Sequence, residues 1–465
     1  SELVAVGERV FGACDPNAES NLSMNDGHLF VAEADAGGTV LQDFFPGEVH
    51  QVVGGDAGVI DDIVWYGASR EGSRATWIAD GDGLARQVAT VSASHIRDLG
   101  DGRGAFVAEG SLWRVVGTES DPAATVEAVD GPQDPADLLV VGDHLFLTAT
   151  GGGAGRELWR FDGSTAERVV DIAAGSADGL QNPDYLSTWH RFRSSQLVAW
   201  QEGLVFAAND GDGVELWYSD GSIGDAEQLT DLAATAIGEI VRLGDRLVFA
   251  ANAAGHGREL WATDGGAGGA WRIADIASGA ADAAPRWLTV VDDRVFFTAD
   301  DGTDRELWVT DAALTTAAMV VNLHDDAHPP MSLVAVGGQC LFTLDQDATG
   351  EELWQSDGSA AGTSMVADLW PGYRGSEPFA GDLINSVVVG DTIYFAAGQP
   401  AVGVELFSYS PETVAAPERQ VWIDVDLEEP VEASADGLSA PVPTTFTTIP
   451  SRELLIEFQA VEGNG

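Results

Sequence analysis

The sequence predicts an all-β chain of 465 residues that folds as a β-propeller of four-stranded antiparallel blades with a C-terminal extension. Three observations lead to this fold class: a motif centred on an aromatic residue recurs nine times, the clearest units hold four runs of strand length, and long helical stripes are absent from the sequence. Successive motif centres are 47, 36, 46, 58, 44, 47, 46 and 53 residues apart, and such a period is typical of repeat architectures. The centres are Phe30, Trp77, Trp113, Trp159, Trp217, Trp261, Trp308, Trp354 and Phe407.

One unit, residues 287–323, shows why each repeat is expected to form a small sheet. Its runs at 288–291, 294–299, 305–310 and 318–323 are rich in β-branched and aromatic residues. Gly, Asp and Thr separate the runs, as in turns between antiparallel strands. Units of this kind are typical of a β-propeller, in which each unit is a blade around a central channel. Nine blades are favoured over eight; the lower number applies if the third or the ninth unit is not a true blade.

The recurring Glu-Leu-Trp, often followed by Asp-Gly, has a structural interpretation in this fold. Leu and Trp are adjacent, so a strand directs them to opposite faces, where each fills space between neighbouring blades. Asp-Gly marks the hairpin turn between the third and fourth strands. An Asp that closes the fourth strand is expected to accept hydrogen bonds from nearby backbone amides, and these residues are Asp43, Asp171, Asp231, Asp275 and Asp368.

Residues 352–369 carry the fullest copy of the motif, Glu-Leu-Trp-Gln-Ser-Asp-Gly-Ser-Ala-Ala-Gly-Thr-Ser-Met-Val-Ala-Asp-Leu. This pattern resembles the ELWxxDGT repeat, a hyalin-like repeat of secreted bacterial proteins. The resemblance is strong over residues 150–370 and weak over residues 1–130. It implies a propeller and an exported protein, and it implies no particular activity.

The period divides the chain into two parts. Residues 1–425 hold the nine units and are expected to form the propeller, whereas residues 426–465 form a Pro/Thr-rich linker and a terminal β-strand. That strand is expected to dock on the propeller or to extend the sheet edge of another chain. Its apolar side chains are therefore candidate partner contacts: Leu454, Leu455, Ile456 and Phe458.

The chain is strongly acidic, with a net charge of −53 from 75 acidic and 22 basic residues, and all the basic residues are Arg. Such charge opposes a compact state unless counterions screen it. Adaptation to high salt is favoured over the binding of many divalent cations. Nucleic acid and anionic membranes are excluded as partners because they would be repelled. No apolar run approaches the ~18 residues of a membrane span, so membrane insertion is excluded as well.

The cysteines and the first residue bear on the compartment. Cys14 and Cys340 fall in units one and eight, which a nine-blade ring would not place side by side, so a disulfide is not favoured. Ser1 in place of Met fits the removal of a signal peptide, and it fits a trimmed tag equally well. We expect an extracytoplasmic protein (secreted, on the cell surface or periplasmic) from a saline habitat.

Calcium is the one cofactor that the motifs suggest. Two Gly-rich turns place carboxylates at alternating positions, and hard oxygen ligands so placed suit Ca²⁺. Neither turn has the later bidentate Glu of an EF-hand, and acidic turns are expected in so acidic a chain. The candidate ligands are Asp80, Asp82, Asp210 and Asp212. His324 and His328 lie in a connection just before two prolines and are interpreted as solvated.

A long connection at residues 179–196 is the main irregularity in the repeat. Long loops in compact folds tend to be functional or disordered, and aromatic residues and Arg dominate interface hot spots. We interpret this connection either as a partner contact or as a lid over the channel mouth. Its candidate residues are Tyr185, Trp189, His190, Arg191 and Phe192.

No catalytic residue is assigned, because Gly-x-Ser-x-Gly, His-Glu-x-x-His and the phosphate-binding Gly-Lys-Ser/Thr are all missing from the sequence. We therefore expect a non-enzymatic, exported, salt-adapted propeller that acts as a binding or assembly module, with protein partners and a glycan as a further ligand class. A related hypothesis is an accessory subunit held in a larger complex by residues 426–465. The alternative is an exported propeller hydrolase or lyase that uses channel-mouth carboxylates with calcium. Its mark would be charged side chains from several blades that converge on the channel mouth.

Overall fold

The computed structural model is all-β in the part of the chain that it describes, since every assigned element there is a strand. None of these residues forms a helix that could cross a bilayer. The described residues are 4–6, 9–14, 28–33, 51–52, 57–61, 63–70, 73–79, 85–116, 125–180, 197–266, 269–323, 329–372, 375–376, 386–399, 403–411 and 418–419.

Five sheets have four antiparallel strands each, paired in the order in which they follow along the chain. Each corresponds to one sequence unit, so the predicted four-stranded unit is confirmed there. Their strands are β16 (Leu197–Trp200), β17 (Gly203–Asn209), β18 (Val214–Ser219), β19 (Glu227–Gln228), β20 (Ala236–Leu243), β21 (Arg246–Ala253), β22 (Gly257–Thr263), β23 (Ala270–Arg272), β24 (Arg286–Val291), β25 (Arg294–Asp300), β26 (Arg305–Thr310), β27 (Ala317–Val321), β28 (Met331–Val336), β29 (Gln339–Gln346), β30 (Gly350–Ser356), β31 (Ser364–Ala367), β32 (Ser386–Val389), β33 (Thr392–Gln399), β34 (Gly403–Tyr409) and β35 (Glu418–Arg419).

Three further sheets precede these five, with three, five and seven strands in the described residues. The first holds β1 (Val4–Val6), β2 (Arg9–Cys14) and β3 (His28–Glu33). The second holds β4 (Gln51–Val52), β5 (Gly58–Ile60), β6 (Ile63–Arg70), β7 (Ser73–Ala79) and β8 (Ala85–Ala89). The third holds β9 (Ser94–Gly100), β10 (Arg103–Ala108), β11 (Ser111–Val116), β12 (Thr125–Val141), β13 (His144–Gly151), β14 (Ala154–Phe161) and β15 (Ala166–Arg168).

Strand β12 explains why the number of sheets differs from the favoured nine. It pairs with β11 through residues 125–133 and with β13 through residues 133–141, so the third and fourth sequence units share one long strand. The described residues therefore form eight separate sheets, of which seven contain a path of at least four strands. The propeller arrangement of four-stranded antiparallel sheets is confirmed, whereas nine separate sheets are not seen.

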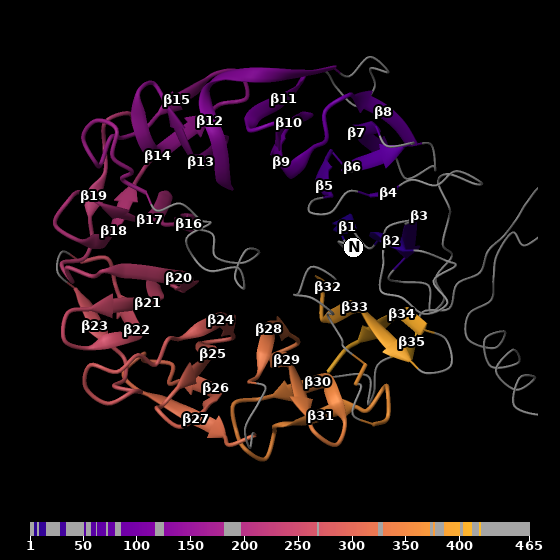
Figure 1. Ribbon diagram of the computed structural model, residues 1–465, viewed down its shortest axis with the longest axis vertical. Coiled ribbons are helices and arrows are strands. Elements are labelled where there is room, and N and C mark those ends of the chain that lie inside the picture. Colours follow the sequence, from indigo (N-terminus) through magenta and orange to yellow (C-terminus); the bar gives the residue numbers. More distant parts are fainter. Residues whose placement is uncertain are drawn as a thin grey trace, which may run out of the picture.

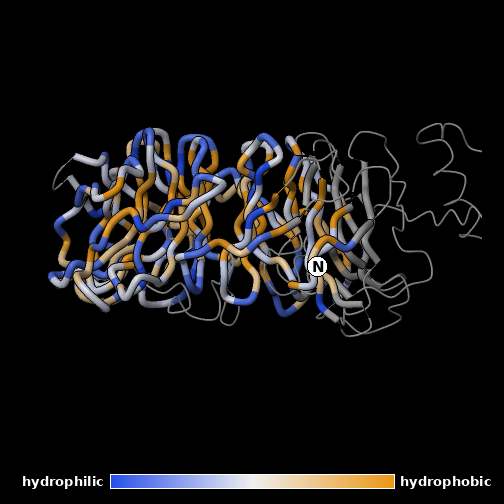
Figure 2. The backbone as a smooth tube through the Cα atoms, turned by 90° about the horizontal axis from the view of Figure 1, so that it is seen from above, coloured by the Kyte–Doolittle hydropathy of each residue, from blue (hydrophilic) through white to orange (hydrophobic). Residues whose placement is uncertain are grey.

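The sheets are arranged as a ring, with the first strand of each four-stranded sheet nearest the centre and the fourth at the periphery (Figure 1). Successive inner strands contact one another, as β16 contacts β20, β20 contacts β24 and β24 contacts β28. Strand β1 contacts both β5 and β32, so the first and last sheets meet and close the ring. Seen edge-on, the strands run between two faces whose turns are mostly hydrophilic (Figure 2).

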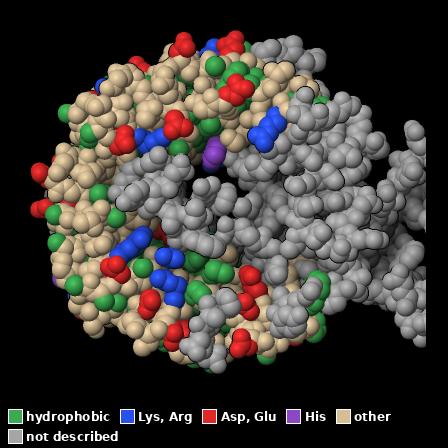
Figure 3. All heavy atoms as spheres, viewed as in Figure 1, with side chains coloured by type: hydrophobic (Ala, Val, Ile, Leu, Met, Phe, Trp, Pro, Cys, Tyr) green, Lys and Arg blue, Asp and Glu red, His purple; other side chains and the backbone are tan. Residues whose placement is uncertain are grey.

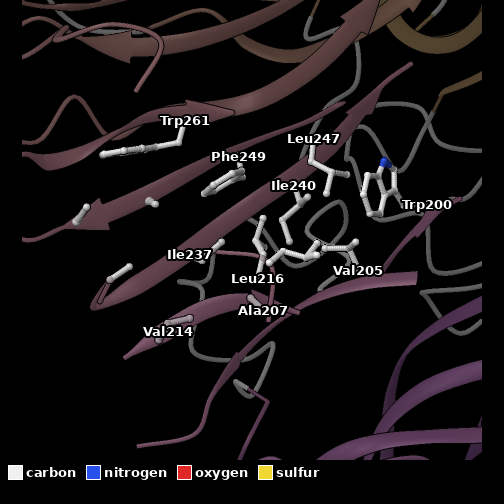
Figure 4. Packing of buried hydrophobic residues seen from close by; sticks show 14 residues of the cluster. Trp200, Val205, Ala207, Val214, Leu216, Ile237, Ile240, Leu247, Phe249 and Trp261 are labelled. Carbon is white, nitrogen blue, oxygen red and sulfur yellow. The ribbon is translucent and has the colours of Figure 1, made fainter. Parts of the chain in front are cut away.

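In the five Glu-Leu-Trp copies the Leu and the Trp lie in different cores, as predicted. The Leu of one sheet packs with the aromatic residue of the next sheet, so neighbouring blades are joined by the same pair of positions. Figure 4 shows one such core, with Leu216 of β18 and Trp261 of β22. Burial of one such side chain is worth about 1.5–3 kcal/mol. The other pairs are Leu158 with Trp217, Leu260 with Trp308, Leu307 with Trp354, and Leu353 with Phe407.

The Asp-Gly pair forms the hairpin turn after the third strand, as predicted. Asp264 Oδ1 accepts the N–H of Gly266 at 3.0 Å, and Gly265 has a positive φ of 81°. A Cβ at Gly265 would lie 2.0 Å from Cη2 of Trp200 in the preceding sheet, so only glycine fits against that ring. The turn therefore joins neighbouring sheets as well as closing a hairpin.

The motif Glu, and not the Asp at the end of strand four, receives the backbone amides of the connection to the next sheet. Glu259 accepts the N–H groups of Ile276 and Ala277 at 3.1 and 2.9 Å. Asp171 and Asp275 instead form ion pairs with Arg168 and Arg272. The expectation is corrected for Asp171 and Asp275, because the Glu side chain, and not the Asp, is fully buried beneath the connection. Asp43 lies outside the described residues. The same arrangement recurs at Glu157, Glu215, Glu306 and Glu352.

Candidate functional site: charged side chains on the inner rim

Most of the site residues expected from the sequence lie outside the described residues. These are Tyr185, Trp189, His190, Arg191, Phe192, Leu454, Leu455, Ile456, Phe458, Asp80 and Asp82.

Asp210 and Asp212 are described, and they lie in an exposed turn between β17 and β18. Oδ1 of Asp210 accepts the N–H of Asp212 at 3.1 Å, an ordinary turn contact. The part of the chain that the structure describes has no group of three or more His, Cys, Asp or Glu that could hold a metal. Calcium binding at this turn stays a prediction. Cys340 is a buried free thiol in β29.

Charged side chains of two neighbouring sheets meet instead on the inner side of the ring. We define the rim cluster as Glu239 of β20, Arg258 of β22, Arg286 of β24 and Arg305 of β26. Figure 3 shows basic side chains gathered on the inner rim over this part of the ring. All three Arg are half-buried. The chain has only 22 basic residues against 75 acidic ones, so a gathering of three is unexpected.

The positions of two of the arginines are determined by the repeat motif. Arg258 and Arg305 come immediately before the motif Glu, so each shares a strand face with the motif Leu two residues further on. Arg156 occupies the same motif position in β14. It is neutralised there by Asp134 at 2.9 Å.

The acidic groups of the rim are held by backbone amides. Oε1 and Oε2 of Glu239 accept the N–H groups of Trp287 and Leu288 at 3.1 and 2.7 Å, which links β20 to β24. Oδ1 of Asp282 accepts the backbone N–H of Arg258 at 2.7 Å. Among the described residues no carboxylate forms an ion pair with the guanidinium groups of the cluster. Glu239 and Asp282 nevertheless raise the pKa of Arg258, and Asp300 raises that of Arg305, so three carboxylates lie near the three arginines.

The three guanidinium groups act on one another. Burial lowers the pKa of Arg258, and the neighbouring Arg286 lowers it further, against the opposite effects of Glu239 and Asp282. Burial lowers the pKa of Arg305 to about 10, and Arg286 again adds to the effect. Arg286 thus disfavours the charged form of both neighbours, an effect that a bound anion would offset.

The sequence carries one signal for this cluster. Arg precedes the motif Glu in three of the five clear copies, at positions 156, 258 and 305. The meeting with Arg286 could not be read from this pattern, because it depends on how two sheets lie side by side in the ring.

The fold and the rim cluster define a β-propeller protein with a charged inner rim. No protein-family model and no curated protein matches the chain. Solved structures do match it. A puromycin hydrolase is 17% identical over 78% of this chain and 53% of its own, with a TM-score of 0.41. The acylaminoacyl peptidase of Pyrococcus horikoshii is 10% identical over 78% and 52%, with a TM-score of 0.39. The propeller domain of the Trilobed protease from Pyrococcus furiosus is 13% identical over 67% and 96%, with a TM-score of 0.37.

These findings correct the expectation of a non-enzymatic binding or assembly module. The structures that match are a hydrolase, a peptidase and the propeller of a protease. The chain spans about half the length of the first matched structures. At these identities and TM-scores their activities stay with those proteins, and we base the function of this chain on its own rim.

Proposed function

We propose that this propeller works in a hydrolase and that its inner rim contacts the substrate. The observation that carries this function is the convergence of charged side chains from β20, β22, β24 and β26, two strands from each of two neighbouring sheets. Half-buried, mutually repelling charges cost stability, and proteins concentrate such groups where they bind or transform ligands. Convergence of this kind is the mark expected of a propeller hydrolase.

We assign the rim cluster to substrate binding and not to bond cleavage. Both oxygens of Glu239 already accept backbone N–H groups, so this carboxylate is occupied in holding β20 against β24. A general base needs a free acceptor within hydrogen-bond reach of the substrate proton. The arginines donate hydrogen bonds and do not accept protons at neutral pH.

A hydrolysis assay tests the proposed function. The protein, in its native assembly, is incubated with chromogenic aminoacyl, peptidyl, ester and glycoside substrates. We expect turnover of at least one class, with kcat/KM reduced about tenfold or more in Arg258→Gln, since a hydrogen bond to a charged group is worth about 1.5–3 kcal/mol. The control is Arg272→Gln, which removes an Arg paired with Asp275 on the outer strand β23. Absence of turnover with every class, or equal loss in both variants, would contradict the function.

The nine sequence units are proposed to be nine radial units, two of which share β12. The two halves of β12 pair with different partners, and register shifts lie within both pairings. A cryo-electron microscopy map viewed down the ring is expected to show nine radial units, and eight or fewer would contradict the count.

An extracytoplasmic, saline location is part of the same proposal, as are membership of the ELWxxDGT repeat proteins, calcium binding and a protein partner. The net charge of −53 without Lys supports the saline location, because screening by salt is what such a surface requires. Fractionation of the native cells is expected to place the protein outside the cytoplasmic membrane. Recovery in the cytoplasmic fraction would contradict the location.

A further inference from the structure

We propose that Arg258, Arg286 and Arg305 form a binding site for an oxyanion, the chemistry that carboxylate, phosphate and sulfate groups share. The site would hold the anionic group of the substrate, so its biological role rests on the proposed hydrolase. Binding itself can be measured without any catalysis.

The three side chains are placed by specific local features. Nη1 of Arg305 donates to the carbonyl oxygens of Ala284 and Thr298 at 2.8 and 3.2 Å, which fixes this guanidinium and leaves its other N–H groups available. Arg258 lies against Gly238, where a Cβ would come within 2.1 Å of Nη2. Glycine at this position of β20 therefore makes room for the guanidinium group.

Two donors in the cluster have no protein acceptor among the described residues. Nε of Arg258 and Nε of Arg286 are both buried there without a hydrogen-bond partner. Buried polar groups are nearly always paired, so an unpaired donor calls for a ligand or an ion. In the same motif position, Arg156 donates to Thr148 at 3.2 Å and pairs with Asp134. Among the described residues Arg258 and Arg305 form no ion pair with an acid, although Glu239, Asp282 and Asp300 lie near enough to act on them. The two arginines differ from Arg156 in this respect.

An oxyanion matches what these donors offer. The guanidinium fork presents parallel N–H groups to two oxygens of one carboxylate, phosphate or sulfate group, which a single-centre chloride cannot satisfy equally well. Negative charge between the three Arg would also relieve their mutual repulsion. The net charge of −53 repels anions from the molecule as a whole. A bound anion must therefore be held by these local donors.

Calorimetric titration of the full chain tests the site. Inorganic phosphate, sulfate and succinate are titrated separately at constant ionic strength, with chloride as the reference. We expect saturable binding of at least one oxyanion and a higher Tm in its presence, as ligand linkage requires. Preference for phosphate or sulfate would assign an ester substrate, and preference for succinate would assign a carboxylate substrate. No binding beyond that of chloride would overturn the site.

Substitutions place the binding at the cluster. We expect Arg286→Gln to weaken the bound oxyanion about tenfold or more, from the loss of charged hydrogen bonds. Arg286→Lys, which keeps the charge but not the fork, should give an intermediate affinity, and Arg272→Gln should leave the affinity unchanged. Circular dichroism tests whether each variant is folded. If Arg286→Gln does not fold, Arg305→Gln replaces it. Wild-type affinity in folded variants of the cluster would overturn the site, whereas oxyanion binding without hydrolysis would contradict only the proposed function.

Discussion

Glu259 accepts the backbone N–H of Ala277, 18 residues further along the chain, at 2.9 Å. The same relationship joins Glu215 to Ala233 and Glu352 to Trp370. A buried carboxylate in the third strand thus fixes the start of the connection to the next sheet. The repeat conserves this arrangement because the connection has no strand partner to satisfy its amides.

The buried carboxylates make stability depend on pH. Burial raises the pKa of Glu259 from 4.5 to about 7. The folded state therefore keeps a proton that the unfolded state loses, so the contribution of this group is complete below pH 4.5 and is lost as pH rises through about 7. We expect the free energy of unfolding of the wild type to fall relative to Glu259→Gln by about 3 kcal/mol across this window. Urea titrations at several pH values measure the difference, and Glu167→Gln, at an exposed ion pair with Arg160, should show no such trend.

Truncation of a motif Leu should weaken one boundary between sheets. Leu260 is fully buried in the core that also contains Trp308 of the next sheet. We expect Leu260→Ala to lower the free energy of unfolding by about 2–5 kcal/mol, through lost burial and the cavity left behind. The control is Ile223→Ala, since Ile223 is 52% exposed and should cost little. Equal costs in chemical denaturation would argue against the inter-sheet core.

Two glycines with the same φ allow the cost of backbone strain to be distinguished from the cost of overpacking in Gly→Ala variants. Gly265 and Gly279 both have φ of 81°, but a Cβ at Gly265 would meet Trp200, whereas a Cβ at Gly279 would meet no atom within 4 Å. We expect both Ala variants to pay the left-handed strain of about 1 kcal/mol, and Gly265→Ala to lose a further 1–3 kcal/mol by overpacking. Similar Tm values for the two variants would show that residue 265 is not tightly packed against the Trp200 ring.

Salt should stabilise this protein. Its net charge of −53 produces self-repulsion, which ions screen over a Debye length that falls to about 3 Å at 1 M. We expect Tm to rise with KCl and to level off near that concentration. Calorimetric scans in KCl, with sucrose as a neutral control, measure the effect, and a Tm independent of salt would contradict it.

The thiol of Cys340 should react only when its sheet opens. It is fully buried in β29, and burial raises the pKa of the thiol far above its ordinary value. In a Cys14→Ser variant we expect labelling by a thiol reagent to follow the unfolding transition in urea. Rapid labelling of the folded protein would show that this core is open to solvent.

The sequence predicts the strands within each sheet well, and it predicts the contacts between neighbouring sheets poorly. Alternation in segments such as residues 288–310 predicts strands, and the adjacency of Leu and Trp predicts two cores, because both follow from the period of two along a strand. The role of Glu259 does not follow from the sequence, since an acidic residue in an apolar strand reveals its partners only when the connection is folded over it. The rim cluster cannot be predicted from the sequence for a similar reason. Arg258 and Arg286 belong to two different sheets, and the sequence does not show how those sheets lie side by side.

Ring closure between β1 and β32 is the claim on which the inner rim depends. Spin labels at Ala5→Cys and Val388→Cys, in a Cys14→Ser background, measure the distance between these strands by pulsed electron paramagnetic resonance. Packed sheets lie about 10 Å apart, so closure predicts a distance of about 10–20 Å. A distance of about 70 Å, as between the ends of a straight stack of eight sheets at that spacing, would contradict the ring.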